Sequence, residues 1–189
     1  MPMRRPEVTE FLLTRRSCPA KLLHGPAPER EAVMRMLTAA MRVPDHGKLA
    51  PWRFLVLEGT ALAGFAARVR ARAAETGQDA DKGALAFEQA PMAVAVVASP
   101  QPSEKIPVIE QTLSVGAAAL SLVNAALAEG WGASWLTGWP AYDRGLVEAA
   151  LGLGPEEWIA GFVYIGHCDA PPPERPRPEP ESRVRWLGA

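Results

Sequence analysis

The chain has 189 residues, of which 48% are hydrophobic and 22% charged, as is usual for a soluble globular protein. Its 20 Lys and Arg nearly balance its 21 Asp and Glu, so the net charge of −1 gives no overall field that would favour nucleic acid or an anionic membrane. Residues 1–53 nevertheless hold ten Lys and Arg against five Asp and Glu. A basic segment of this length favours a small anionic ligand over a polyanion.

The two cysteines, Cys18 and Cys168, lie far apart and match no CxxC or zinc-ligand spacing. No signal-peptide pattern is evident at the start of the sequence. We therefore expect a cytoplasmic protein in which both thiols are free. The most apolar stretch, Val115 to Ala128, has 14 residues, fewer than the roughly 20 that cross a bilayer, and is expected to be a buried helix.

The first half of the sequence predicts a series of helices and one strand. Residues 8–14 form a short amphipathic helix, and Pro19 discourages its continuation. A second helix begins near Pro28 and ends before Pro44, because its apolar residues repeat at helical spacing. Residues 44–51 form a polar loop, 52–57 a strand, and 60–76 an Ala-rich helix capped by Thr60. Residues 78–87 are too mixed to assign.

The second half predicts the middle of a sheet and its central helix. Residues 92–98 are a continuous run of small apolar residues, typical of a strand covered on both faces. Residues 112–129 form the longest helix, which Gly130 ends. Two further strands are expected at residues 134–137 and 158–165, on either side of a helix that Asp143 caps. We expect one α+β domain over residues 1–169, a three-layer α/β/α sandwich with a mixed central sheet.

Residues 170–189 form a separate tail in which six of twenty residues are proline. Such a segment cannot build its own core and is expected to be an extended arm. Val184, Trp186 and Leu187 near its end are apolar, which suggests that the arm docks on the domain or on a partner subunit.

Two polar clusters could carry chemistry. Arg15, Arg16 and Ser17 place two guanidinium groups and a hydroxyl together directly after a helix, a combination suited to a phosphate monoester. The alternative is a solvated basic helix end. Arg42 lies just before the polar loop and His46 lies within it, and both could face an anion or simply solvent. A Ser17–His46 hydrolase pair is set aside because no GxSxG motif occurs.

A third candidate is the glycine-rich stretch 130–138, where small residues would let a planar ring approach the main chain. Its tryptophans could equally belong to the core. The sequence has no GxGxxG, Walker A or HExxH motif and no cluster of metal ligands, so no metal site is expected.

Six motifs in order resemble the FMN-dependent nitroreductase family, and in particular its short subgroup, over nearly the whole chain. They are Arg15-Arg16-Ser17, residues 42–46 through 51–54, Ala90-Pro91 before the strand 92–98, residues 114–118, the stretch from Gly130 to Gly138, and Gly161 to Gly166.

The resemblance implies that Arg15, Arg16 and Ser17 hold the FMN phosphate and ribityl end, while Arg42 and His46 reach the same flavin from the other subunit. Trp135, Leu136, Thr137 and Gly138 would border the flavin ring, with a main-chain N–H near Thr137 and Gly138 directed at N5. It further implies an intertwined homodimer with FMN at the interface. No side chain would act as a catalytic acid or base, because the flavin carries the hydride.

The implied activity is ping-pong reduction of nitroaromatics, quinones or similar electron-poor small molecules, with NADPH or NADH as the reductant. Three alternatives remain: a specialised reductase of the same fold, such as a dehalogenase; an FMN-binding protein without enzymatic activity; and a phosphate-ester binder without flavin.

Overall fold

The computed structural model describes residues 3–170 and 172–188. The chain runs α1 (Pro6–Thr14), η1 (Ala20–Leu22), α2 (Arg30–Ala40), η2 (His46–Lys48), β1 (Trp52–Glu58), α3 (Gly59–Thr76), α4 (Ala80–Gln89), β2 (Met92–Ala98), α5 (Val108–Ala128), β3 (Gly132–Leu136), α6 (Trp139–Tyr142), α7 (Arg144–Leu151), β4 (Trp158–Gly166) and η3 (Pro180–Ser182). All the longer helices and strands predicted from the sequence are confirmed within a few residues.

Helix α4 lies in the segment that the sequence left unassigned. Its start is fixed by the side chain of Asp79, which accepts a hydrogen bond from the Lys82 backbone N–H at 3.0 Å. The helix is hard to recognise because its buried face includes Gly83, a poor helix former. A Cβ at this position would lie 2.6 Å from the Trp139 indole, so the glycine serves the packing of α4 on α6.

The predicted cap of the Ala-rich helix was wrong. Helix α3 begins at Gly59, one residue before Thr60, and its N-cap residue is Glu58, whose side chain makes no capping hydrogen bond. The chain turns directly from β1 into α3 through Gly59, which has a φ of +51° that a glycine adopts without strain.

The four strands form one sheet in the order β1-β2-β4-β3. The α+β sandwich is confirmed, but the expected mixture of strand directions is not, because every pairing within the described residues is antiparallel. The connections give the reason. Two helices, α3 and α4, join β1 to β2, and two more, α6 and α7, join β3 to β4. In a connection of two helices the chain reverses three times, once between the helices and once at each end of the pair, so the next strand enters antiparallel to the previous one.

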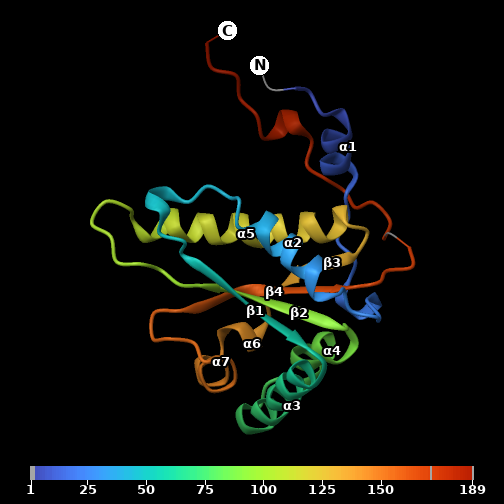
Figure 1. Cartoon of the computed structure of the whole chain (residues 1–189), viewed down its shortest axis with the longest axis vertical. Helices are drawn as coiled ribbons and strands as arrows, with labels where there is room; N and C mark the ends of the chain where they lie inside the picture. Colours follow the sequence, from blue (N-terminus) through green and yellow to red (C-terminus); the bar gives the residue numbers. More distant parts are fainter. Residues whose placement is uncertain (1–2, 171, 189) are drawn as a thin grey trace.

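Helices cover both faces of the sheet (Figure 1). Helices α2 and α5 pack on one face, where the core is built from residues such as Met36, Val94 and Leu122. Helices α3, α4, α6 and α7 cover the other face, around a cluster of Phe65, Phe87 and Phe162. Strand β2 is buried along its whole length, as the sequence predicted.

Helix α5 has two unlike sides. Val115, Ala119 and Leu122 are buried against the sheet, which confirms that the apolar stretch is a core helix. Val108, Ile109, Leu113 and Leu120 are exposed. By length and hydropathy alone α5 would also qualify as a candidate membrane-spanning helix, a test that core helices of soluble proteins pass as well.

Helix α1 and the C-terminal residues extend past α5, away from the sheet (Figure 1). None of the residues of α1 is buried. Among the described tail residues, 170 and 172–188, only η3 has regular structure, and Trp186 and Leu187 are more than four-fifths exposed. Within this chain the apolar residues at both ends therefore remain open to solvent.

The expectation of two free thiols was wrong, since Cys18 and Cys168 form a disulfide. They are 150 residues apart in sequence, and the fold brings them together. The segment after Cys18 pairs with the end of β4 through a bridge between His24 and His167. Local spacing motifs cannot reveal such a contact, because it depends on the arrangement of the whole sheet.

Candidate functional site

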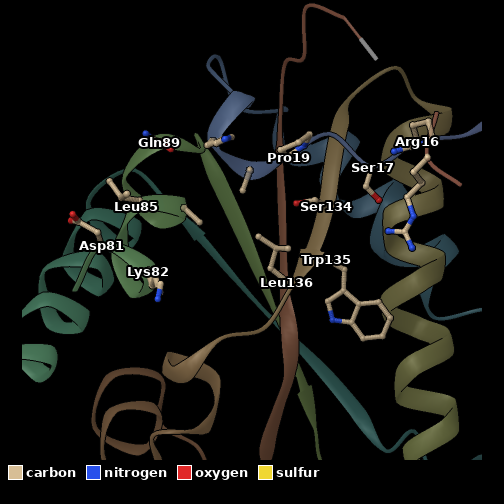
Figure 2. Close-up of a pocket in the computed structure, with 14 residues that line it drawn as sticks. Arg16, Ser17, Pro19, Asp81, Lys82, Leu85, Gln89, Ser134, Trp135 and Leu136 are labelled. Carbon is tan, nitrogen blue, oxygen red and sulfur yellow. The ribbon is translucent and has the colours of Figure 1, made fainter. Parts of the chain in front are cut away.

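The candidate site is a cavity of about 650 Å³ at the end of β3 (Figure 2). Figure 2 shows Trp135 and Leu136 of β3 between Arg16 and Ser17 on one side and helix α4 on the other. The lining residues come from four parts of the chain: Arg16, Ser17, Pro19, Ala20, Lys21, Asp81, Lys82, Leu85, Ala86, Gln89, Ser134, Trp135, Leu136 and Arg175.

Arginines from opposite ends of the chain gather at one side of this cavity. The Arg15 Nη2 group donates to Ser17 Oγ at 2.9 Å, and Arg16 Nη1 donates to Glu174 Oε1 at 2.8 Å. Arg177 approaches the same Glu174 oxygen at 3.2 Å. One carboxylate is thus shared by two arginines, which leaves a local excess of positive charge.

The electrostatics of Arg15 reflect that excess. Its partial burial, followed by the charges of Arg177 and Arg16, lowers the pKa of the Arg15 guanidinium from its usual value. An arginine stays protonated even so, and the crowding of like charges costs free energy in the empty site. A bound anion would relieve this repulsion.

Backbone contacts fix the position of this cluster. Helix α1 ends at Thr14, and the following segment runs beside β3, where the Cys18 N–H donates to the Ala133 carbonyl at 3.0 Å. This contact places Ser17 next to Ser134, and both line the cavity. The site is therefore built on the edge strand of the sheet.

Two buried polar atoms at the site have no hydrogen-bond partner among residues 3–170 and 172–188: Arg15 Nε and Ser134 Oγ. A buried polar group without a partner costs roughly 1–3 kcal/mol, so such atoms usually point to a missing ligand or water. The cavity is lined by Arg16, a donor for an anion, and by Ser134, whose hydroxyl can bind a second polar group, and Arg15 Nε lies one residue before Arg16. This combination fits a phosphorylated ligand such as FMN.

The far end of β3 provides a flat, partly exposed surface. The Trp135 indole N–H donates to the Ala160 carbonyl at 3.1 Å, which holds the ring on strand β4. Gly161 makes room for it, because a Cβ at that position would overlap the indole. Thr137 and Gly138 follow in the exposed turn before α6, and Gly138 has a φ of +125°.

Of the nine residues predicted for the site, the structure brings seven to this region, and Arg42 and His46 lie elsewhere. His46 Nδ1 is 3.1 Å from Glu110 Oε2 at the start of α5, and Arg42 is exposed just beyond the end of α2. Neither lines the cavity. Within one chain the cavity is thus formed without the polar loop.

Sequence reasoning missed part of the lining. Lys82 and Gln89 come from α4, which the sequence did not reveal as a helix, and Lys21 and Arg175 lie outside the recognised motifs. The one available signal was the pair Arg175 and Arg177 in a tail that is otherwise rich in proline and glutamate. Three more cations, Lys21, Lys82 and Arg175, therefore line the cavity than the motifs alone suggested.

Comparisons with known proteins show the family to which the chain belongs. The model of the nitroreductase family matches residues 12–167. YdjA of Escherichia coli K12, whose name describes an inferred NAD(P)H nitroreductase, is 36% identical over 163 residues, covering 85% of this chain and 87% of YdjA. A protein of Haemophilus influenzae with a similar name is 37% identical over 160 residues, covering 82% of this chain and 85% of its own.

Solved structures have the same fold. A nitroreductase-like protein from Bacillus cereus superposes with a TM-score of 0.82 at 20% identity, with both chains fully covered. A nitroreductase-type protein from Desulfovibrio desulfuricans, crystallised with FMN, gives a TM-score of 0.75 at 22% identity, covering 99% of this chain and all of the other. The chain belongs to the nitroreductase family, a family of oxidoreductase enzymes.

Proposed function

We propose that this protein is an FMN-dependent oxidoreductase that uses NADPH or NADH to reduce electron-poor small molecules such as nitroaromatics or quinones. The observation that carries the proposal is the cavity at the end of β3, where an arginine cluster and two buried polar atoms without partners in the described part of the chain converge. The names of the relatives support the reductant, and the complex of the Desulfovibrio protein supports the cofactor.

In this proposal the basic side of the cavity binds the FMN phosphate. Arg15, Arg16 and Ser17 would hold the phosphate and the ribityl end, and Arg175 adds a further cation on the same side. Ser134 Oγ gains a partner on binding. Charge-assisted hydrogen bonds of this kind are the strongest that a protein offers to a phosphate.

The other side of the cavity would accept the flavin ring. Trp135 and Leu136 provide the apolar edge. The backbone N–H groups of Thr137 and Gly138, in the exposed turn that follows, would be the donors to the flavin ring. The bound flavin would supply the redox chemistry by taking a hydride from the nicotinamide at N5 and passing it to the acceptor in a second step. The chain's own residues bind and orient, and none is needed as an acid or base.

The same proposal includes a homodimer in the cytoplasm, where the reduced nicotinamides are available. Helix α1 has nine residues and buries none of them, and a helix of that length is marginal unless it packs on something. Ile109, Leu113 and Leu120 on α5 add exposed apolar surface. A second copy that covers these surfaces could also bring its Arg42 and His46 to the flavin.

The test of the cofactor and the activity is spectroscopic. The purified protein is incubated with FMN, desalted, and titrated anaerobically with NADPH or NADH while its absorbance is recorded. We expect retained yellow flavin that bleaches on addition of the reductant. Retained flavin that does not bleach would favour the non-enzymatic FMN binder, and the absence of retained flavin would refute the proposal.

A charged substitution on the exposed apolar side of α5 tests whether the protein is a dimer. Leu113→Glu is expected to shift the protein from dimer to monomer in light scattering at micromolar concentration, because a carboxylate in an apolar interface is strongly unfavourable. Tyr142→Glu, at an exposed position on α6, is the matched control and should remain dimeric. A wild-type protein that elutes as a monomer would exclude the dimer.

A further inference from the structure

The Cys18–Cys168 disulfide joins the two segments that supply the arginine cluster. Cys18 directly follows Arg15, Arg16 and Ser17 in sequence. Cys168 lies just past the end of β4, at the root of the tail that carries Glu174 and Arg175. A single covalent bond therefore links both halves of the proposed phosphate site.

The noncovalent contacts between these two segments are modest. Arg16 meets Glu174 at 2.8 Å, but the Glu174 side chain is 61% exposed, and ion pairs of this kind contribute little. His24 and Asp169 approach at 2.9 Å, also at the surface. The backbone bridge between His24 and His167 lies on the far side of Cys18 from the arginines. The disulfide is thus the strongest restraint next to the cluster.

The disulfide can be reached from outside. Cys18 is 2% exposed, whereas Cys168 is only partly buried. Both cysteines line a cavity of about 170 Å³, together with Arg16, Trp131 and Pro172. A small thiol therefore has access to the bond, and Arg16, which lines the same cavity, supplies a positive charge that favours a thiolate there.

From these observations we infer that Cys18–Cys168 is a thiol–disulfide exchange site for a small dithiol, and that its oxidation state sets the affinity of the neighbouring phosphate site. The inference rests on the proposed function, because FMN is the ligand whose affinity changes. In a cytoplasmic protein a disulfide is usually redox-responsive and not permanent, which agrees with this role.

The exchange is a two-electron reaction. One thiolate of the dithiol attacks the Cys168 sulfur, the Cys18–Cys168 bond breaks, and Cys18 leaves as a thiolate that takes up a proton. The second thiol of the reductant then loses its proton and attacks the mixed disulfide, which releases Cys168 as a thiolate that is protonated in turn. The reductant ends as a cyclic disulfide, and the protein gains two electrons and two protons as two thiols.

Reduction removes the covalent link between Cys18 and Cys168, while the His24–His167 bridge and the Cys18–Ala133 contact remain. The tail arginines are then held beside Arg16 and Ser17 mainly by the exposed Arg16–Glu174 ion pair. We expect the FMN dissociation constant to rise by about 5- to 150-fold, the usual range for coupling between two sites. Because such coupling is reciprocal, saturating FMN should make the disulfide harder to reduce by the same factor.

The experiment measures FMN binding to the full chain by quenching of flavin fluorescence, with and without dithiothreitol, while the thiols are counted by a chromogenic reagent. Two thiols should appear on reduction, and FMN affinity should fall. Cys168→Ser is the matched control, since it should bind FMN as weakly as the reduced wild type and should not respond to dithiothreitol. Thermal melting of both forms shows whether they remain folded.

Equal FMN affinity in the oxidised and reduced proteins would overturn the inference and leave the proposed function intact. A Cys168→Ser variant that still responds to dithiothreitol would overturn it too, because the effect would then arise elsewhere. Loss of the folded state in both the reduced protein and the variant would make the disulfide a purely structural crosslink, which likewise contradicts a switch. If neither the oxidised nor the reduced protein bound FMN, the proposed function itself would be refuted.

Discussion

Arg53 of β1 and Glu157, next to the start of β4, form a two-pronged ion pair across the sheet. Arg53 Nε and Nη2 each lie 2.6 Å from a Glu157 carboxylate oxygen. Glu157 also accepts the Gly154 N–H at 2.9 Å. The pair ties β1 to the residue directly before β4, although β2 lies between these two strands.

This ion pair predicts a pH dependence of stability. The Arg53 side chain lowers the pKa of Glu157 to about 2, below its ordinary value near 4.5. A carboxylate whose pKa is lower in the folded state stabilises the fold fully above its unfolded pKa and loses that contribution as the pH falls toward 2. Glu157→Gln should therefore reduce the free energy of unfolding near pH 7 by about 1–2 kcal/mol, since Arg53 remains partly solvated.

Urea denaturation near pH 7 and near pH 3 measures this effect. The difference between wild type and Glu157→Gln should shrink at the lower pH. Glu156→Gln, at the exposed neighbouring position, should change the free energy of unfolding by less than about 0.5 kcal/mol at both pH values. A difference that stays constant with pH would show that the charge of Glu157 does not stabilise the fold.

Arg15→Ala tests the phosphate site. We expect it to weaken FMN binding by about 1.5–3 kcal/mol, because a charge-assisted contact is lost. Fluorescence titration with FMN gives the dissociation constant. Arg68→Ala on α3 removes an equal charge from a helix remote from the arginine cluster and should leave the constant unchanged. Equal affinity for the wild type and Arg15→Ala would remove Arg15 from the site.

Ser134→Ala separates a ligand contact from a structural one. Ser134 Oγ is buried without a partner in the described part of the chain, so its removal should not destabilise the FMN-free protein and should raise its stability by about 1 kcal/mol or more, because the cost of the unpaired hydroxyl is relieved. FMN affinity should fall by about 0.5–1.5 kcal/mol. The two quantities come from urea denaturation and fluorescence titration.

Ser114→Ala is the control for Ser134→Ala, because the Ser114 hydroxyl has hydrogen-bond partners within the chain. This hydroxyl donates to the Pro44 carbonyl at 2.7 Å and accepts the Trp52 indole N–H at 3.1 Å, so its loss should cost about 1–2 kcal/mol of stability without FMN. If Ser134→Ala instead destabilised the FMN-free protein as much as Ser114→Ala, Ser134 would be a structural residue.

Gly161→Ala should damage the surface on which the flavin ring is proposed to lie. The added methyl group would overlap the Trp135 indole at a backbone φ of +157°, so we expect a loss of about 2–4 kcal/mol in stability and a change in tryptophan fluorescence. Gly64→Ala is the control within helix α3. Its added methyl group would meet no atom of the described residues within 4 Å, and the substitution should raise stability by about 0.5–1 kcal/mol. Similar stabilities for Gly161→Ala and wild type would mean that Trp135 can move freely.

Much of the fold could be predicted from the sequence, because its strongest signals are local. The unbroken apolar run of β2 requires burial on both faces, and the cap of α7 is visible in Asp143, which accepts the Leu146 N–H at 2.9 Å. Helix α4 was missed because Gly83 is there to make room for Trp139, a contact between elements far apart in sequence.

The site likewise contains residues that the sequence predicts and residues that only the fold brings together. Arg15, Arg16 and Ser17 are adjacent in sequence, so their suitability for a phosphate could be predicted without a structure. Arg175 and Lys82 join them only because the tail and α4 fold against the end of β3. Nothing in their local sequence distinguishes them from solvated surface cations.

The sequence by itself determined the types and order of the main helices and strands, the family and the core of the phosphate motif, since these depend on periodicity and on residues that are neighbours along the chain. The tertiary structure decided the antiparallel directions of the strands, the additional cations around the cavity and the pairing of Cys18 with Cys168. These features join residues up to 150 positions apart, and only the packing of helices on a completed sheet brings such residues into contact.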